Sequence, residues 1–163
     1  MSRPTIDKGI LLQGIVALLE EEVADIRIGF EEARRTSIES PGRMQSRYDT
    51  MGVEAAWVAD GLAKNLKSKI ESLARLRQLR LPPAPLKGCV GAVVGVGTPE
   101  GSESIYFILP GGGGQTVQPS EKGAPVVIVT PGSPAGKALI GKEVGDEVIV
   151  GADSGPKSIS WML

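Results

Sequence analysis

Two glycine-containing segments in the second half of the chain have residue types that can bind phosphate. Residues 111–114 are all glycine, and residues 132–137 begin with a glycine and end in a lysine. Phosphate loops combine glycine backbone N–H groups with a lysine and with a Ser or Thr hydroxyl that binds Mg²⁺. The first segment lacks the lysine, and Ala138 stands in the second where the hydroxyl is needed. We therefore interpret the glycine run as a turn and expect no bound nucleotide at either segment.

A second group of candidate residues surrounds a Ser-, Pro- and Gly-containing interruption at residues 36–43. Glu39 and Asp49 carry carboxylates there that can bind a divalent cation, whereas Arg43 and Arg47 lie between them and oppose it. One interpretation is a solvated loop with scattered charges. The other is an exposed tip that places charges inside a cavity of a partner.

Basic residues gather further along the first half, where residues 64–80 include Glu71 as their single acid. Such a run can contact an acidic or phosphate-rich surface, and it can equally be the solvated face of a helix. We interpret Trp57 and Tyr48 as packing residues. The candidate basic stripe consists of Lys64, Lys67, Lys69, Arg75 and Arg77.

The composition excludes several classes of site. The chain of 163 residues has no histidine, one cysteine (Cys89) and a formal net charge of −1. A zinc site, an intrachain disulfide and histidine acid–base chemistry are therefore excluded. A near-neutral chain is also not a polycation built for nonspecific nucleic-acid binding. No signal peptide or membrane span is recognisable, which together with the single cysteine favours a reducing cytoplasm.

The sequence of the first half predicts two helices, which carry the basic stripe and the charged residues around the interruption. Apolar residues recur there at spacings of three and four, which predicts an antiparallel helical hairpin over residues 1–81 with its tip near residues 40–42. The two expected stripes are Ile15, Leu18, Leu19, Glu22, Ile26, Phe30 and Ala33, and then Val58, Leu62, Leu66, Ile70, Leu73 and Leu76.

A proline-rich linker at residues 82–87 separates this hairpin from a glycine-rich second half, 88–163. Alternating β-branched and small residues predict strands at 89–96, 104–109, 126–129 and 147–150. Ser133 is an expected N-cap, Pro134 an expected first helical residue and Gly141 an expected left-handed terminator of one short helix. The sequence thus predicts the α+β class, with an antiparallel sheet wrapped on one short helix.

The same region carries a motif that is similar to one in a known family. A strand ending at Thr130 leads through Pro131 and Gly132 into SPAGKALIG at residues 133–141, and KEVGDEV follows at 142–148. This arrangement resembles the C-terminal signature of the bacterial Gre transcription elongation factors over roughly residues 88–150. The resemblance implies an N-terminal coiled-coil hairpin and a C-terminal FKBP-like β domain.

The resemblance also implies a partner and a mode of action. Gre factors bind RNA polymerase through the C-terminal domain at the rim of the secondary channel, and their coiled coil reaches toward the active site. The loop that opens the short helix contacts the polymerase, which implicates Gly132, Ser133 and Pro134. The chain would then be a cytoplasmic monomer and no enzyme itself. It would have no cofactor of its own, share at most Mg²⁺ with the polymerase active site, and contact transcript RNA and DNA only indirectly.

The tip departs from the family pattern, which is Asp-Leu-(Ser/Lys)-Glu-Asn-x-Glu-Tyr. Aligning the tyrosine on Tyr48 puts Pro41, Met44 and Arg47 at the three acidic positions. We therefore expect a factor that modulates elongation and competes with true cleavage factors. The alternative is a cleavage-competent factor that uses Glu39 and Asp49 in another register.

Two further alternatives belong to other classes of protein. The FKBP-like fold suggests a prolyl isomerase, but the aromatic residues of the second half are Tyr106, Phe107 and Trp161, and the adjacent pair points to opposite faces of a strand. A coiled-coil adaptor that dimerises through Ile10, Leu11 and Ile15 is the other alternative.

Overall fold

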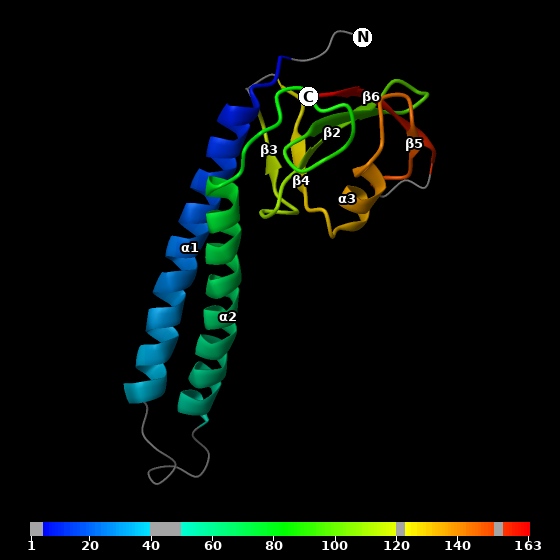
Figure 1. Ribbon diagram of the computed structural model, residues 1–163. Helices are drawn as coiled ribbons and strands as arrows, with labels where there is room; N and C mark the ends of the chain where they lie inside the picture. The colour runs from blue at the N-terminus through cyan, green and yellow to red at the C-terminus, as the bar shows by residue number, and fades with distance from the viewer. Residues whose placement is uncertain (1–4, 40–49, 120–122, 152–154) are drawn as a thin grey trace. The chain divides into compact units, whose positions relative to one another are not determined.

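The computed structural model describes residues 5–39, 50–119, 123–151 and 155–163 (Figure 1). It has two long helices, then a six-stranded sheet with one short helix, so the α+β class predicted from the sequence is confirmed. By compactness the chain divides into Met1–Val16 with Ala74–Leu163, and Ala17–Leu73. The division predicted from composition, at 1–81, 82–87 and 88–163, stays a prediction.

The first two helices, α1 (Lys8–Glu39) and α2 (Met51–Arg77), lie side by side (Figure 1). The Lys69 ammonium pairs with the Glu22 carboxylate across them, and a Cβ added to Gly29 would lie 3.6 Å from Leu62 Cδ1. Going from Glu22 to Gly29 advances seven residues on α1, and going from Lys69 to Leu62 moves back seven residues on α2. The helices are therefore antiparallel, and both contacts belong to one register.

The contact between the helices follows a heptad. Its positions alternate steps of three and four residues, which is the spacing that keeps side chains on the shared face of two supercoiled helices. The heptad positions are Leu19, Glu22, Ile26, Gly29 and Ala33 on α1 and Ala59, Leu62, Leu66, Lys69 and Leu73 on α2, and all of them are buried or half-buried. We call these ten residues the seam.

The seam differs in part from the apolar stripes expected from the sequence. Val58 and Ile70 were expected to pack, yet their side chains are 55% and 42% exposed. Residues 58, 62, 66 and 70 are each four apart, and four residues rotate 400°, so a stripe of that spacing drifts 40° per step around the helix. The residues at its ends leave the contact, and Ala59 and Lys69 take their places.

The six strands form one mixed sheet with the order β3-β4-β2-β1-β6-β5. All neighbouring strands pair antiparallel except β2 and β4, which are parallel, so the expected all-antiparallel sheet is corrected at this one pair. The strands β3 and β6 were not predicted. The bounds are β1 Val93–Gly97, β2 Glu103–Ile108, β3 Thr116–Val117, β4 Val126–Val129, β5 Glu147–Val148 and β6 Lys157–Met162.

The short helix α3 (Pro134–Leu139) contributes Leu139 to a buried cluster with one face of the sheet. Phe107 is fully buried and lies outside that cluster, whereas its neighbour Tyr106 belongs to it, as expected for adjacent strand residues. Side chains are therefore buried on both faces of β2. Among the described residues, no helix combines the length and apolar character needed to cross a membrane. The cluster consists of Ala92, Val94, Val96, Tyr106, Ile108, Val129, Leu139, Val148, Val150, Ile159 and Met162.

Candidate functional site

The loop that opens α3 is held by the side chain of Ser133. The Ser133 hydroxyl accepts a hydrogen bond from the Gly136 backbone N–H at 3.1 Å and donates one to the Thr130 carbonyl at 2.7 Å. Ser133 is thus the N-cap, Pro134 occupies the first turn, and Gly141 follows the helix with φ +78°. All three features confirm the sequence prediction.

Close backbone contacts fix the two ends of α3. A Cβ added to Gly136 would lie 1.9 Å from the Thr130 carbonyl oxygen, and one added to Gly88 would lie 2.0 Å from the Leu139 carbonyl oxygen. No side chain larger than hydrogen fits at either position. Gly88 also bonds to the chain after the helix, because its N–H donates to the Lys142 carbonyl and its carbonyl accepts from the Gly141 N–H. The loop is therefore presented from a fixed helix.

The three predicted docking residues differ in accessibility. Gly132 and Pro134 are exposed, whereas Ser133 is half-buried and its hydroxyl is engaged inside the loop. The structure thus brings the three together on one turn. Gly132 and Pro134 have surfaces that a partner can contact, and Ser133 holds the turn in shape.

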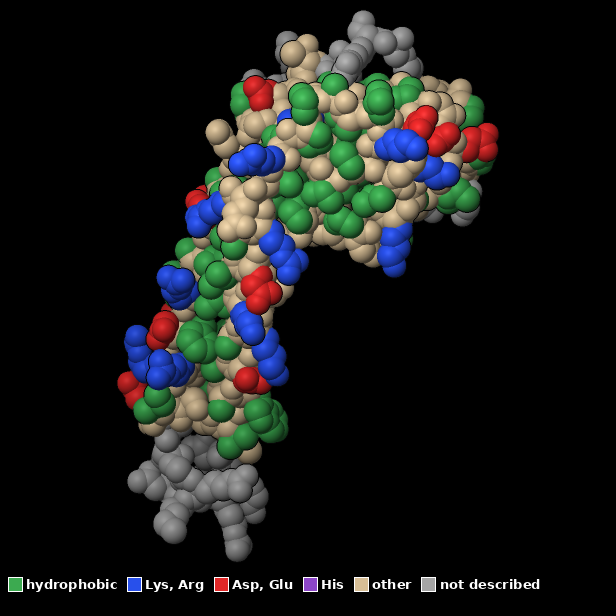
Figure 2. Space-filling view, viewed as in Figure 1, with side chains coloured by type: hydrophobic (Ala, Val, Ile, Leu, Met, Phe, Trp, Pro, Cys, Tyr) green, Lys and Arg blue, Asp and Glu red, His purple; other side chains and the backbone are tan. Residues whose placement is uncertain are grey.

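The candidate basic stripe does not form a single row. Lys69 belongs to the seam, where it pairs with Glu22, while Lys64, Lys67 and Arg75 are exposed. At 100° per residue these three share a face of α2, and Arg77 lies on another. Figure 2 shows Lys and Arg side chains interspersed with acidic ones along the hairpin.

Lys64 has an acidic partner one helical turn away. Its ammonium lies 2.9 Å from the Asp60 carboxylate, with both side chains largely exposed. The hydrogen bond that Lys64 donates to Asp60, followed by the negative charge of Asp60, raises the pKa of Lys64 above its ordinary value of 10.5. Acids are therefore more frequent on this face than expected, since Asp60 and Glu71 both lie on it.

Trp57 is not the packing residue that was expected. Its side chain is 72% exposed on α2, because position 57 lies outside the heptad positions that face α1. Tyr48, the other aromatic residue interpreted in this way, lies outside the described residues.

At the end of α1, Glu39 is exposed and borders a shallow depression with Glu31, Arg34, Arg35 and Ile38. Two guanidinium groups therefore accompany it at this end of the helix. Across the parts of the chain that the structure describes, no cluster of three acidic or cysteine side chains fits a metal ion. The remaining tip residues considered from the sequence lie outside the described residues, namely Pro41, Arg43, Met44, Arg47 and Asp49.

Sequence reasoning missed two interactions in the sheet. Trp161 on β6 donates its indole N–H to Glu103 Oε1 on β2 at 2.6 Å, and Lys157 is 7% exposed with its ammonium bonded to the Val150 carbonyl. A signal for strand β6 was present in the sequence. Ser158 and Ser160 alternate there with Lys157, Ile159 and Trp161, whose side chains are buried.

By its fold the chain belongs to the proteins that combine a helical hairpin with a small sheet domain that follows it. No family model matches the chain, and no curated protein does. Solved structures that resemble it are of Gre-factor homologs. They include GreA factor homolog 1 (Gfh1) of Thermus thermophilus, with 22% identity over 91% of this chain and 94% of that one and a TM-score of 0.38.

Two further structures carry the same name. The transcription factor Gfh1 matches with 21% identity, 88% coverage of both chains and a TM-score of 0.36. Thermus aquaticus Gfh1 matches with 20% identity, coverage of 90% of this chain and 92% of that one, and a TM-score of 0.35. TM-scores below 0.5 are too low to transfer a function, so any functional proposal depends on the chain's own residues.

Proposed function

We propose that this chain is a Gre-like transcription elongation factor that binds RNA polymerase at the secondary channel and modulates elongation. The observation that supports it is the α3 loop. The residues of the Gre-type signature fold into the capped helix that the motif implies, and Gly132 and Pro134 are exposed at its start. In this proposal Gly132 and Pro134 contact the polymerase, and Ser133 positions them.

The proposal assigns no cleavage chemistry to the chain. Two-metal hydrolysis requires carboxylates that bind a magnesium ion. The described end of α1 offers Glu31 and Glu39 together with Arg34 and Arg35, so two guanidinium charges offset the two carboxylates. The family alignment replaces the tip acids with Pro41, Met44 and Arg47. The factor therefore acts by occupying the channel, is not itself an enzyme, and works in the cytoplasm as a monomer.

Binding to core RNA polymerase tests the docking part of the proposal. We expect Pro134→Arg to weaken binding at least about tenfold, since a long charged side chain would replace the exposed ring at the contact. Val144→Arg is the matched control, because Val144 is also exposed on the same domain but lies outside the loop. Failure of the unmodified protein to bind polymerase at moderate salt would refute the proposal.

Transcript cleavage on a stalled, backtracked elongation complex tests the tip. We expect no stimulation of cleavage, together with slowed elongation or protection of the complex from a genuine Gre factor. Stimulated cleavage that disappears in Glu39→Ala or Asp49→Ala would instead establish the cleavage-competent alternative.

A further inference from the structure

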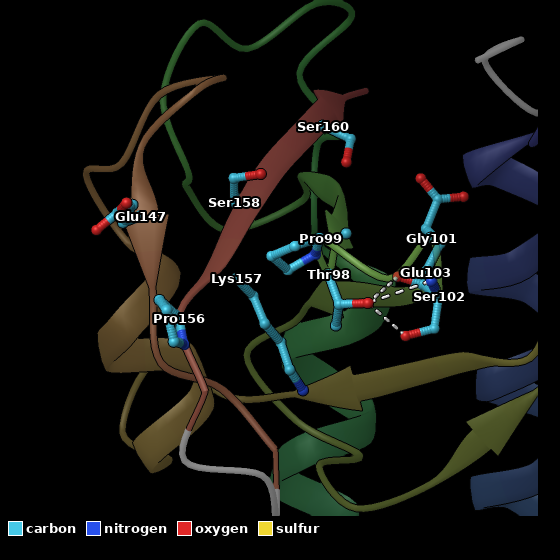
Figure 3. Close-up of a pocket in the computed structure, with 11 residues that line it drawn as sticks. Thr98, Pro99, Gly101, Ser102, Glu103, Glu147, Pro156, Lys157, Ser158 and Ser160 are labelled. Carbon is cyan, nitrogen blue, oxygen red and sulfur yellow. Dashed lines mark hydrogen bonds between the residues drawn. The ribbon is translucent and has the colours of Figure 1, made fainter.

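A cavity of about 230 Å³ lies on the sheet domain, where β1 leads into the turn at residues 98–102 and β6 begins (Figure 3). It is separate from the α3 loop and has no role in the function proposed above. Its polar lining includes hydroxyls and two carboxylates, contributed by Thr98, Ser102, Glu103, Glu147, Ser158 and Ser160.

The floor of the cavity is a glycine. The strand register places Gly97 beside Glu103 on one side and beside Ser158 on the other, and Ser158 beside Glu147. Four neighbouring strands thus present Glu, Gly, Ser and Glu in one row. A Cβ on Gly97 would lie 2.8 Å from Ser160 Oγ, so the missing side chain is what leaves this space open.

A β-bulge places Ser160 over this floor. Gly95 pairs with Trp161 and Val96 pairs with Ile159, so Ser160 lies between two paired residues and has no partner on β1. Such a bulge redirects side chains and is frequent next to functional sites. The Trp161 ring lies against Gly95, where an added Cβ would lie 2.2 Å from Cε2.

The indole of Trp161 in turn fixes one acid of the cavity. Its N–H donates to Glu103 Oε1 at 2.6 Å, so the Glu103 carboxylate is held by one oxygen. Within the described residues, Glu103 Oε2 and the hydroxyls of Ser158 and Ser160 accept no hydrogen bond from the protein. Three acceptors are therefore available to a ligand.

The charge of the cavity is negative. Lys157 contributes to its wall, but its ammonium donates to the Val150 carbonyl on the side opposite Ser158 and Ser160 (Figure 3). The carboxylates of Glu103 and Glu147 are thus not neutralised by this lysine. A cation with several N–H donors fits such a lining better than an anion or an apolar group.

We propose that this cavity binds the side chain of an arginine in a partner protein. A guanidinium has five donors in a planar fork, so it can bind the Glu103 carboxylate and still donate to a neighbouring hydroxyl of the lining. A lysine ammonium has three donors around one atom and matches the spread of acceptors less well.

The indole N–H signal of Trp161 in a nitrogen–proton NMR spectrum reports on this site directly. The chain has two tryptophans, so a Trp57→Phe variant assigns the signal. We expect N-acetyl-arginine methylamide to shift the Trp161 signal saturably, and the shift to weaken as salt is added. The neutral analogue N-acetyl-citrulline methylamide, which has the same shape without the charge, should not shift it.

Two variants and one control locate the binding. We expect Glu103→Gln, which keeps an oxygen for the indole, to weaken binding at least about tenfold. Gly97→Ser fills the floor and should abolish binding, whereas Glu71→Gln on α2 should leave it unchanged. Equal shifts with citrulline, unchanged binding by Glu103→Gln, no shift at all, or a saturable shift of the same signal by Mg²⁺ would each overturn the proposal. None of these outcomes depends on whether the protein binds polymerase.

Discussion

The hairpin and the sheet domain bury their apolar side chains to very different degrees. Between Ala17 and Leu73, the buried hydrophobic residues in the described part are Leu19, Ala59 and Leu73. In the sheet domain, side chains such as Phe107 and Ile128 are completely buried. Two helices share one line of contact and leave their other faces to solvent, whereas the sheet domain encloses the side chains of its central strands.

This difference in buried area means that the two regions depend on different residues for their structure. The sheet domain is held together by its buried apolar side chains. Its glycines and the Ser133 cap determine the shape of the loops and of the cavity at its surface. The hairpin has little area to bury, and its register depends on a few seam residues. The hydrophobic effect scales with the area removed from water, so equivalent substitutions should have unequal effects in the two regions.

The largest effect should come from Phe107→Ala. Removing a completely buried aromatic side chain costs about 3–5 kcal/mol of unfolding free energy, because transfer and cavity terms add. The matched change in the hairpin, Leu66→Ala, removes a half-buried side chain and should cost under about 2 kcal/mol. Urea unfolding, followed by Trp161 fluorescence in a Trp57→Phe background and by helical circular dichroism, measures both. Equal costs would contradict the comparison.

A smaller effect is expected from Ser133→Ala, which removes the N-cap of α3. Loss of a side-chain cap typically costs about 1 kcal/mol. Ser133→Thr is the control, since threonine keeps a hydroxyl that can accept from the Gly136 N–H and donate to the Thr130 carbonyl, and it should unfold at nearly the same urea concentration as the unmodified protein. If Thr and Ala are equally destabilising, the two hydrogen bonds of the hydroxyl do not stabilise the loop.

The next smaller effect on stability should come from the ion pair between Lys69 and Glu22 across the seam. Lys69→Glu places two acids opposite each other, and adding Glu22→Lys restores opposite charges in the reverse order. We expect a coupling of about 0.5–1 kcal/mol from the double-mutant cycle, a modest value because both side chains are partly exposed. Additive effects in the cycle would mean that the pair has no role in register.

The smallest effect should be that of Asp60→Asn on α2. The pKa of Lys64 is raised by Asp60, so the pair stabilises the folded hairpin at neutral pH, where Lys64 is charged in both states. This contribution is lost as pH rises through the raised pKa of Lys64. An NMR titration of the Lys64 side chain should give a lower pKa in Asp60→Asn. An unchanged pKa would show that the ion pair does not form in solution.

The sequence predicted best the elements whose signals are local. The α3 helix was located to within one residue because Ser133, Pro134 and Gly141 each favour one position in a helix. The glycine run at residues 111–114 was likewise interpreted as a turn, and Gly112 and Gly114 have positive φ. Local backbone preferences determine such features, so a single sequence reveals them.

The sequence did not reveal features that depend on contacts between residues far apart in the chain. The short strand β3 has two residues and no periodicity to detect, and the parallel pairing of β2 with β4 depends on the whole topology. Trp57 and Val58 look like packing residues until the heptad register with α1 is known. Likewise, the Glu103–Trp161 bond joins residues 58 apart in sequence, so no spacing rule predicts it.

The seam pair also restricts how this hairpin can change length in evolution. Glu22 on α1 faces Lys69 on α2 because both occupy heptad positions of the seam. Inserting one residue between them on one arm rotates that partner by about 100°, whereas inserting seven on each arm restores the contact almost unchanged. Related chains should therefore lengthen or shorten their arms in paired steps of about 10 Å, which is seven residues at 1.5 Å each.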